Sequence, residues 1–153
     1  MIITFCGHST YTYNAEDEEK VLNIIENQSK EEKVVFYLGG YGNFDIFAKN
    51  CAKKYKEKHR DAKLVFVTPY INAWLDERRE YYQEEYDEIL YPELENVPLR
   101  FAIAKRNEWM ARNSDIVIAY VQTHFGGAYA FLRYAIKYKK KIFNIYSGNY
   151  DCK

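Results

Sequence analysis

The chain has 153 residues, and its 22 lysines and arginines balance its 22 aspartates and glutamates. This length fits one domain, so we expect a single domain over residues 1–153. The balanced charge argues against a protein that mainly grips a phosphate polymer, so nucleic acid is not an expected partner. The longest apolar runs fall well short of the roughly 20 residues that span a bilayer, so no membrane association is expected.

The cysteines point to a reducing compartment. Cys6, Cys51 and Cys152 are an odd number and show no CxxC spacing. This pattern predicts neither a disulfide framework nor a metal site, and we expect no cofactor. A charged start followed by an apolar stretch is typical of exported proteins, and the chain does not show this pattern. We therefore expect a cytoplasmic protein.

Short β-rich apolar runs alternate with longer stretches of helical period along the chain. The strands are expected over residues 2–6, 33–38, 63–68, 87–91, 115–121 and 142–146. The first helix is expected to begin near residues 14–17, and the others to cover 43–58, 72–84, 100–112 and 126–139. This alternation indicates an α/β protein, a single-domain Rossmann-like three-layer sandwich with a mostly parallel sheet.

Every glycine follows a predicted strand. They are Gly7 after the first strand, Gly39, Gly40 and Gly42 after the second, Gly126 and Gly127 after the fifth, and Gly148 after the last. In open α/β sheets, ligands bind outside the carboxyl ends of the strands. Main-chain N–H groups of these loops, together with the positive end of the following helix, are therefore predicted to contact an anion or phosphate. Simple tight turning is the alternative interpretation.

Further candidates lie at the same edge. His8 and Ser9 follow the first strand, and His8 would donate to a phosphate or sugar hydroxyl, transfer a proton, or cap its own turn. Arg106 would hold a phosphate with its guanidinium if it faces the pocket, or remain solvated. Tyr70 follows the third strand and would stack on a base or pack. The predicted ligand-binding residues are Gly7, His8, Ser9, Gly39, Gly40, Gly42, Asn43, Tyr70, Arg106, Gly126 and Gly127.

Several segments in order resemble a known family. They are FCGHS, LGGYGNFDIFA, KRNEWMARNSDIVIAYV and FGGAYAFLRYA. Together they resemble the SLOG superfamily, a Rossmann-like group that includes the LOG phosphoribohydrolases and the DprA-type proteins, and especially its small stand-alone bacterial members. The resemblance spans nearly the whole chain. It implies a nucleotide-derived ligand held by glycine-rich loops, and a homo-oligomer.

The LOG enzymes cleave a base from ribose 5′-monophosphate with an arginine in RKxxM and a glutamate in PGGxGTxxE. This chain has RNxxM, so Arg106 matches and Asn107 replaces the lysine. Aligning LGGYGNFDI with the second pattern puts Ile46 at the glutamate position and Asp45 one residue earlier. The carboxylates that remain as catalytic candidates are Asp45 and Glu108, and Asp45 could instead serve only as a favourable charge at a helix start.

Three functions follow. The first is binding or sensing of a nucleotide-derived small molecule through the glycine-rich loops. The second is an N-glycosidic hydrolase or transferase acting on nucleoside monophosphates, with Asp45 or Glu108 as the carboxylate and Arg106 on the phosphate. The third, in the direction of DprA, is single-stranded DNA binding, which would require a basic face that the acidic segment 76–95 opposes.

Overall fold

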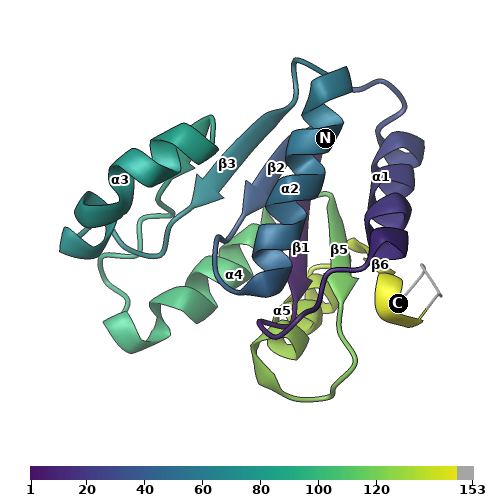
Figure 1. The fold of residues 1–153 in the computed structure, drawn as a ribbon. Helices are drawn as coiled ribbons and strands as arrows, with labels where there is room; N and C mark the ends of the chain where they lie inside the picture. Colours follow the sequence, from purple (N-terminus) through teal and green to yellow (C-terminus); the bar gives the residue numbers. More distant parts are fainter. Residues whose placement is uncertain (148–153) are drawn as a thin grey trace.

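A computed structural model describes residues 1–147 of the chain as one sheet with helices on both faces (Figure 1). The strands are β1 (Ile2–Gly7), β2 (Val35–Leu38), β3 (Lys63–Val67), β4 (Glu88–Leu90), β5 (Ile116–Tyr120) and β6 (Lys141–Asn144). All pairings are parallel, and the strand order is β4-β3-β2-β1-β5-β6. The predicted α/β class is confirmed. Gly148 and Cys152 lie outside the described residues.

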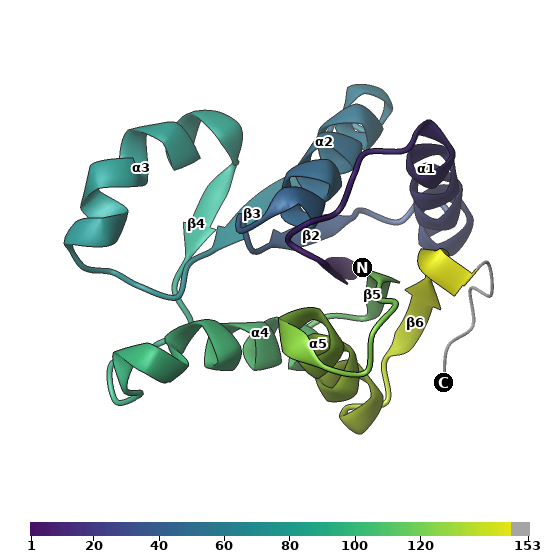
Figure 2. The ribbon, with the colours of Figure 1, turned by 60° about the horizontal axis from the view of Figure 1, so that its bottom comes forward.

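The helices form the two outer layers of the sandwich. They are α1 (Ala15–Ser29), α2 (Asn43–Lys58), α3 (Ala73–Glu85), α4 (Ala102–Arg112) and α5 (Gly126–Lys137), with short 3₁₀ turns at Leu99–Phe101 and Ile145–Ser147. Figure 2 shows α1, α2 and α3 on one face of the sheet and α4 and α5 on the other. None of the helices within residues 1–147 is long and apolar enough to cross a membrane.

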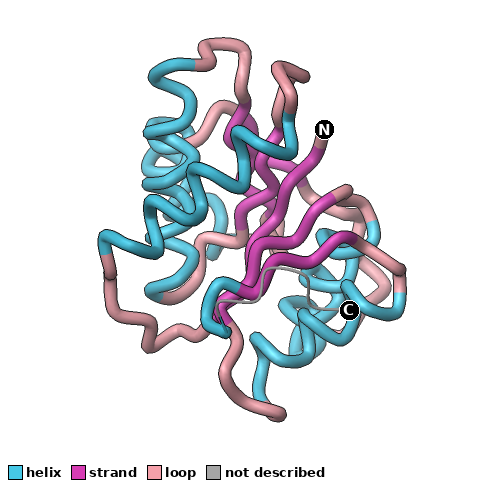
Figure 3. Tube along the Cα trace, turned by 90° about the vertical axis from the view of Figure 1, so that its right-hand side faces the viewer, coloured by secondary structure: helices cyan, strands magenta, loops and turns pink. Residues whose placement is uncertain are grey.

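Each strand supplies side chains to two separate cores, because successive residues of a strand point to opposite faces. On β3, Leu64 and Phe66 join the core beneath α1, α2 and α3. Val65 and Val67 join the core beneath α4 and α5. Burial on both faces explains why the strands appear in the sequence as continuous apolar runs. Figure 3 shows the strands side by side, with helices on either side of them.

The strand order reverses beside β1, and this reversal determines where a ligand can bind. Strands β1 to β4 are added in sequence on one side, and α4 then returns the chain so that β5 lies on the other side of β1. Gly7 at the end of β1 is in register with Tyr120 at the end of β5. Loops that leave these two strands diverge to opposite faces, which opens a crevice at the carboxyl edge.

Candidate functional site

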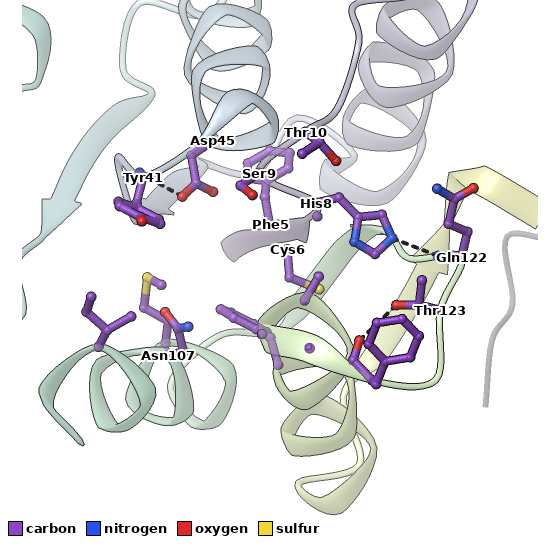
Figure 4. Close-up of a pocket in the computed structure, with 18 of the residues that line it drawn as sticks. Phe5, Cys6, His8, Ser9, Thr10, Tyr41, Asp45, Asn107, Gln122 and Thr123 are labelled. Atoms are coloured by element: carbon purple, nitrogen blue, oxygen red, sulfur yellow. Dashed lines mark hydrogen bonds between the residues drawn. The ribbon is translucent and has the colours of Figure 1, made fainter. Parts of the chain in front are cut away.

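A cavity of about 490 Å³, here called the principal cavity, lies at the carboxyl ends of β1 and β5 (Figure 4). Its lining comes from the loops after these strands, from the beginnings of α2 and α5, and from α4. This volume lies within the range of roughly 300–1,000 Å³ of small-molecule sites. Gly7, His8, Ser9, Asp45, Arg106, Gly126 and Gly127 all line this cavity. Residues from four separate predicted segments therefore meet at one place.

Two helices begin at the principal cavity without a side-chain cap. The N-caps of α2 and α5 are Gly42 and Phe125, and neither makes a side-chain capping hydrogen bond. By contrast, Asn14 and Asn72 cap α1 and α3 by accepting a main-chain N–H with their side chains. An uncapped helix start leaves main-chain donors and the positive end of the helix dipole for an anion. The cavity is therefore suited to a negatively charged group.

The glycine pair at the start of α5 is open to the cavity. Gly126 has φ of 89°, in the region that favours glycine, and a Cβ on either Gly126 or Gly127 would meet no atom within 4 Å. A ligand can therefore approach this part of the main chain closely. The glycine-rich loop after β2 is less open to a ligand, because side chains of the protein itself pack against its main chain.

The Asp45 side chain, at the end of the loop GGYGNFD, folds back onto the main chain of this loop. Its Oδ2 accepts the Tyr41 N–H at 2.8 Å (Figure 4). The carboxyl group is desolvated, which raises its pKa to about 6, although the Tyr41 N–H and the Arg106 charge both act to lower it. One main-chain donor predicted to bind a ligand thus binds the protein's own carboxyl group.

Arg106 lies beneath this loop and is 2% exposed, which excludes the solvated alternative. Its Nη1 donates to the carbonyls of Gly39 at 3.1 Å and Val67 at 2.6 Å, and its Nε donates to Asn107 Oδ1 at 2.9 Å. Burial lowers its pKa. Within residues 1–147, Nη2 donates no hydrogen bond, and no carboxylate forms an ion pair with the guanidinium. The charge of Asp45 acts on the guanidinium only from beyond ion-pair distance, so an anionic ligand at Nη2 would give this buried charge a direct partner.

His8 joins the two strand ends across the crevice. Its Nε2 accepts the Gln122 N–H at 3.0 Å (Figure 4), so the neutral ring carries its proton on Nδ1. The Ser9 carbonyl accepts the Asn43 N–H at 3.0 Å, which ties the loops after β1 and β2 together. Gly42 packs against Ser9. Gly42 and Asn43 line neither this cavity nor the one described next.

A second cavity of about 370 Å³ adjoins the first, and it is here called the second cavity. The two cavities share Tyr41, Ile103 and Arg106 in their linings. The remaining lining residues are Gly39, Gly40, Pro69, Tyr70, Asn72, Trp74 and Leu99. The predicted residues Gly39, Gly40 and Tyr70 thus belong to the second cavity rather than to the principal one.

Sequence reasoning missed Leu99 and Ile103, which line the second cavity and are 67% and 37% exposed. The available signal was a pair of aliphatic side chains, one just before and one within the predicted helix 100–112, at exposed positions where an amphipathic helix carries polar residues. Such exposed apolar side chains at the mouth of a hollow are typical of a contact surface.

Glu108 lies outside both cavities. Its Oε2 accepts the Tyr138 hydroxyl at 2.7 Å, and Lys105 and Lys137 lie within 3.5 Å and 3.9 Å of its carboxylate. The pKa of Glu108 is lowered, chiefly by the Tyr138 hydroxyl. These contacts join α4 to the end of α5, so the carboxylate has a packing role where the structure places it.

No group of three or more His, Cys, Asp or Glu side chains suited to a metal ion occurs within residues 1–147. Cys6 and Cys51 are both free and buried. Desolvation by burial raises the pKa of the Cys6 thiol, which lies in the lining of the principal cavity. Cys6 is therefore a packing residue rather than a thiolate ligand.

Comparison with known structures finds the same fold in DNA processing protein A. The protein from Helicobacter pylori, described by its unique single-stranded DNA binding mode, matches with a TM-score of 0.63 and 19% identity over 94% of this chain and 64% of its own. DNA processing protein A (DprA) from Streptococcus pneumoniae matches with a TM-score of 0.62 and 17% identity over 93% of this chain and 49% of its own. This chain thus spans less than two thirds of the length of either protein. No protein-family model matches the sequence, and no curated protein does either.

The likeness shows a shared fold, the Rossmann-like α/β sandwich that the sequence predicts. It also corrects one expectation. Nucleic acid was not an expected partner because the net charge is balanced, but a protein of this fold is described as binding single-stranded DNA. Net charge is a sum over the whole surface, whereas binding depends on the charges that line the site. The balance of charges therefore does not exclude nucleic acid.

Proposed function

We propose that this protein binds single-stranded DNA along the carboxyl edge of its sheet, with one nucleotide in the principal cavity. The observation that carries the proposal is the succession of two cavities that share Tyr41, Ile103 and Arg106. A single small ligand would fill one of them, whereas linked nucleotides can follow both. The fold shared with the DNA-binding protein of H. pylori supports the same class of ligand.

The chemistry of the edge suits the two parts of a nucleotide. The uncapped and open start of α5 and the buried Arg106 favour phosphate. The rings of Tyr41, Tyr70 and Trp74 line the cavities and offer faces or edges to bases. Stacking on aromatic side chains is the usual way in which proteins hold single strands, and it contributes about 1–3 kcal/mol per base.

The surface near α3 is less negative than its many acidic residues suggest, because several of these residues form ion pairs. Asp76 pairs with Arg79, and Glu85 pairs with Lys49 and Lys53. Near the second cavity, the Arg78 guanidinium lies 4.7 Å from the centre of the Trp74 ring. Several of the acids in segment 76–95 are therefore neutralised by lysines and arginines, and Arg78, which pairs with Glu77, lies beside the proposed path.

Fluorescence anisotropy with a labelled single strand of about 12 nucleotides, titrated with protein at low salt, tests the proposal. We expect saturable binding with a micromolar Kd and weaker binding of a duplex. Gly127→Asp places a carboxylate at the open start of α5 and should weaken binding at least about tenfold by repulsion of phosphate. Asn23→Asp adds the same charge on the exposed side of α1 and is the matched control.

The proposal fails if no single strand binds, or if Gly127→Asp and Asn23→Asp bind as the unchanged protein does. Circular dichroism of both variants would verify that they are folded. Asp at the start of a helix is favourable, so Gly127→Asp should not unfold α5.

A second candidate function is cleavage of an N-glycosidic bond in a nucleoside monophosphate. The specific observation is the position of Asp45, whose desolvated carboxyl group lines the principal cavity beside Arg106. A carboxylate there would stabilise positive charge on an anomeric carbon. Chromatography of nucleoside monophosphates incubated with the protein tests this function. Released base that disappears in Asp45→Asn supports turnover, and bound but intact nucleotide excludes it.

A further inference from the structure

On the basis of the proposed function, we infer that the second cavity is the binding site of a neighbouring base, and that Arg106 contacts the phosphodiester that joins the two nucleotides. The inference concerns where two linked nucleotides bind in the site, whereas the proposed function concerns only the class of ligand. It makes a dinucleotide the smallest ligand that uses the whole site.

The lining of the second cavity suits a flat, mostly apolar ring. Pro69, Tyr70, Trp74, Leu99 and Ile103 supply apolar and aromatic surface. The Tyr70 and Trp74 rings meet edge to face, with 5.3 Å between their centres. The two rings thus hold each other in place and lose little side-chain freedom when a base packs against them.

One polar group is available to the edge of such a base. Asn72 accepts the Trp74 N–H at 3.0 Å with its Oδ1 as the cap of α3. Its amide nitrogen donates no hydrogen bond within residues 1–147 and remains at the cavity. An amide donor at the rim of an apolar hollow matches the carbonyl oxygens of a pyrimidine or guanine ring.

Arg106 lies at the junction of the two cavities. Both hydrogens of Nη1 and the hydrogen of Nε have partners, so Nη2 is the nitrogen that can contact a ligand. A Cβ on Gly39 would lie 3.4 Å from Nη2, so the glycine keeps this nitrogen uncovered on that side. A phosphodiester would bring a negative charge into direct contact with the buried guanidinium, which the Asp45 charge reaches only from beyond ion-pair distance.

Arg106 is shared by the two adjoining cavities, as a linking phosphate is shared by two neighbouring nucleotides. The principal cavity would hold one nucleotide, Nη2 of Arg106 the linking phosphate, and the second cavity the next base. A mononucleotide would use the first part only. The second cavity therefore predicts a gain in affinity when a second nucleotide is added.

The experiment uses Trp74 as a reporter. The chain has two tryptophans, and Trp109 packs against Tyr37 beneath the other face, so Trp109→Phe leaves Trp74 as the single emitter. The probes are thymidine 5′-monophosphate, the 5′-phosphorylated thymidine dinucleotide, and the same dinucleotide with an uncharged methylphosphonate linkage. We expect the dinucleotide to bind at least about fivefold more tightly than the mononucleotide and to change Trp74 emission, since about 1 kcal/mol is the lower end for one base–aromatic stack.

Two variants test whether the higher affinity for the dinucleotide arises in the second cavity. Leu99→Asp puts a carboxylate at the rim of the second cavity and should remove the advantage of the dinucleotide while leaving mononucleotide affinity unchanged. Phe101→Asp introduces the same charge two residues away, in a side chain that is 47% exposed and lines neither cavity, and should preserve the advantage. The methylphosphonate probe should also lose the advantage, because it lacks the charge that Arg106 would contact.

The outcomes separate this inference from the proposed function. If long strands and both small probes bind, but the dinucleotide shows no advantage or Leu99→Asp has no effect, the inference is wrong and the proposed function stands. If no strand and no nucleotide binds, the proposed function is wrong and the inference falls with it.

Discussion

Asp45 and Arg106 both lie close to the main chain of Gly39 at the end of β2, where a side chain would crowd them. A Cβ on Gly39 would lie 3.2 Å from Asp45 Oδ2 and 3.4 Å from Arg106 Nη2. The two groups interact electrostatically, yet burial dominates the titration of both and disfavours both charges. The charge state of this pair therefore depends on pH in the range in which proteins are handled.

Asp45→Asn should change how stability depends on pH. The folded pKa of about 6 lies above the ordinary value of 3.8, so the protonated carboxyl group stabilises the fold fully below about pH 4. This contribution is lost as pH rises through 6. The variant keeps an acceptor for the Tyr41 N–H and has no titration, so at pH 7 we expect it to be more stable by about 1–2 kcal/mol.

Urea unfolding of both proteins between about pH 4 and pH 7 measures this effect. Asp76→Asn is the control, because the Asp76 side chain is exposed on α3. Parallel curves for the unchanged protein and Asp45→Asn across this range would contradict the prediction.

Gly7 and Gly127 should respond oppositely to alanine. A Cβ on Gly7 would collide with the buried ring of Phe44, so Gly7→Ala should destabilise the protein by roughly 3 kcal/mol. A Cβ on Gly127 meets no atom within 4 Å, so Gly127→Ala should stabilise α5 by about 0.5 kcal/mol while it weakens binding in the principal cavity. Chemical denaturation and DNA titration of both variants check the prediction. Equal stability of the two variants would show that the contact with Phe44 does not require glycine at residue 7.

At the scale of elements, the contrast between capped and uncapped helices has a measurable consequence. Phe125 is 74% exposed and has the extended backbone of an N-cap, so Phe125→Ser should supply the missing cap of α5. We expect the free energy of unfolding to rise by about 1 kcal/mol. The serine hydroxyl would then occupy a donor that we assign to phosphate, so DNA affinity should fall.

Phe125→Ala is the matched control, because it removes the same ring without adding an acceptor. Thermal melts and anisotropy titrations of the two variants separate the effects. If serine and alanine give the same stability and the same affinity, α5 does not bind phosphate through its first turn.

The order and approximate bounds of the elements could be predicted from the sequence, because β-branched runs and helical spacing are local signals. The predicted strand over 33–38 begins at Val35 in the structure, and the helix over 100–112 opens with a 3₁₀ turn at Leu99–Phe101. Such ends depend on caps and tertiary contacts that spacing does not encode. The short strand β4 lies within the acidic segment, where the alternation of polar and apolar residues gave only a weak signal for a strand.

The site could be predicted in part. Arg106 and the glycine pair at residues 126–127 follow from motif and strand-end position, and both line the principal cavity. The carbonyls that hold Arg106 belong to Gly39 and Val67, which are 67 and 39 residues away in sequence. No local pattern reports such contacts. The capture of the Tyr41 N–H by Asp45 likewise depends on the exact path of the turn.

For the whole molecule, the small number of phosphate contacts in the proposed site predicts shallow salt dependence of DNA binding. The proposed site contacts phosphate at Arg106 and at the start of α5, and a basic DNA-binding protein makes more such contacts. The slope of log K against log salt should therefore be roughly −1 to −2, at about −0.7 for each phosphate neutralised on a single strand. Titrations at several salt concentrations measure it. A slope steeper than about −4 would indicate an extended basic surface instead.

The sheet ends on both sides in a very short strand. β4 has 3 residues and β6 has 4, and β6 begins with the exposed Lys141. Short margins with a lysine offer few unpaired main-chain groups to another chain, which is a common protection against aggregation by strand addition. Any homo-oligomer of this protein would therefore assemble through its helices and loops, and concentrated samples should not convert readily to cross-β fibres.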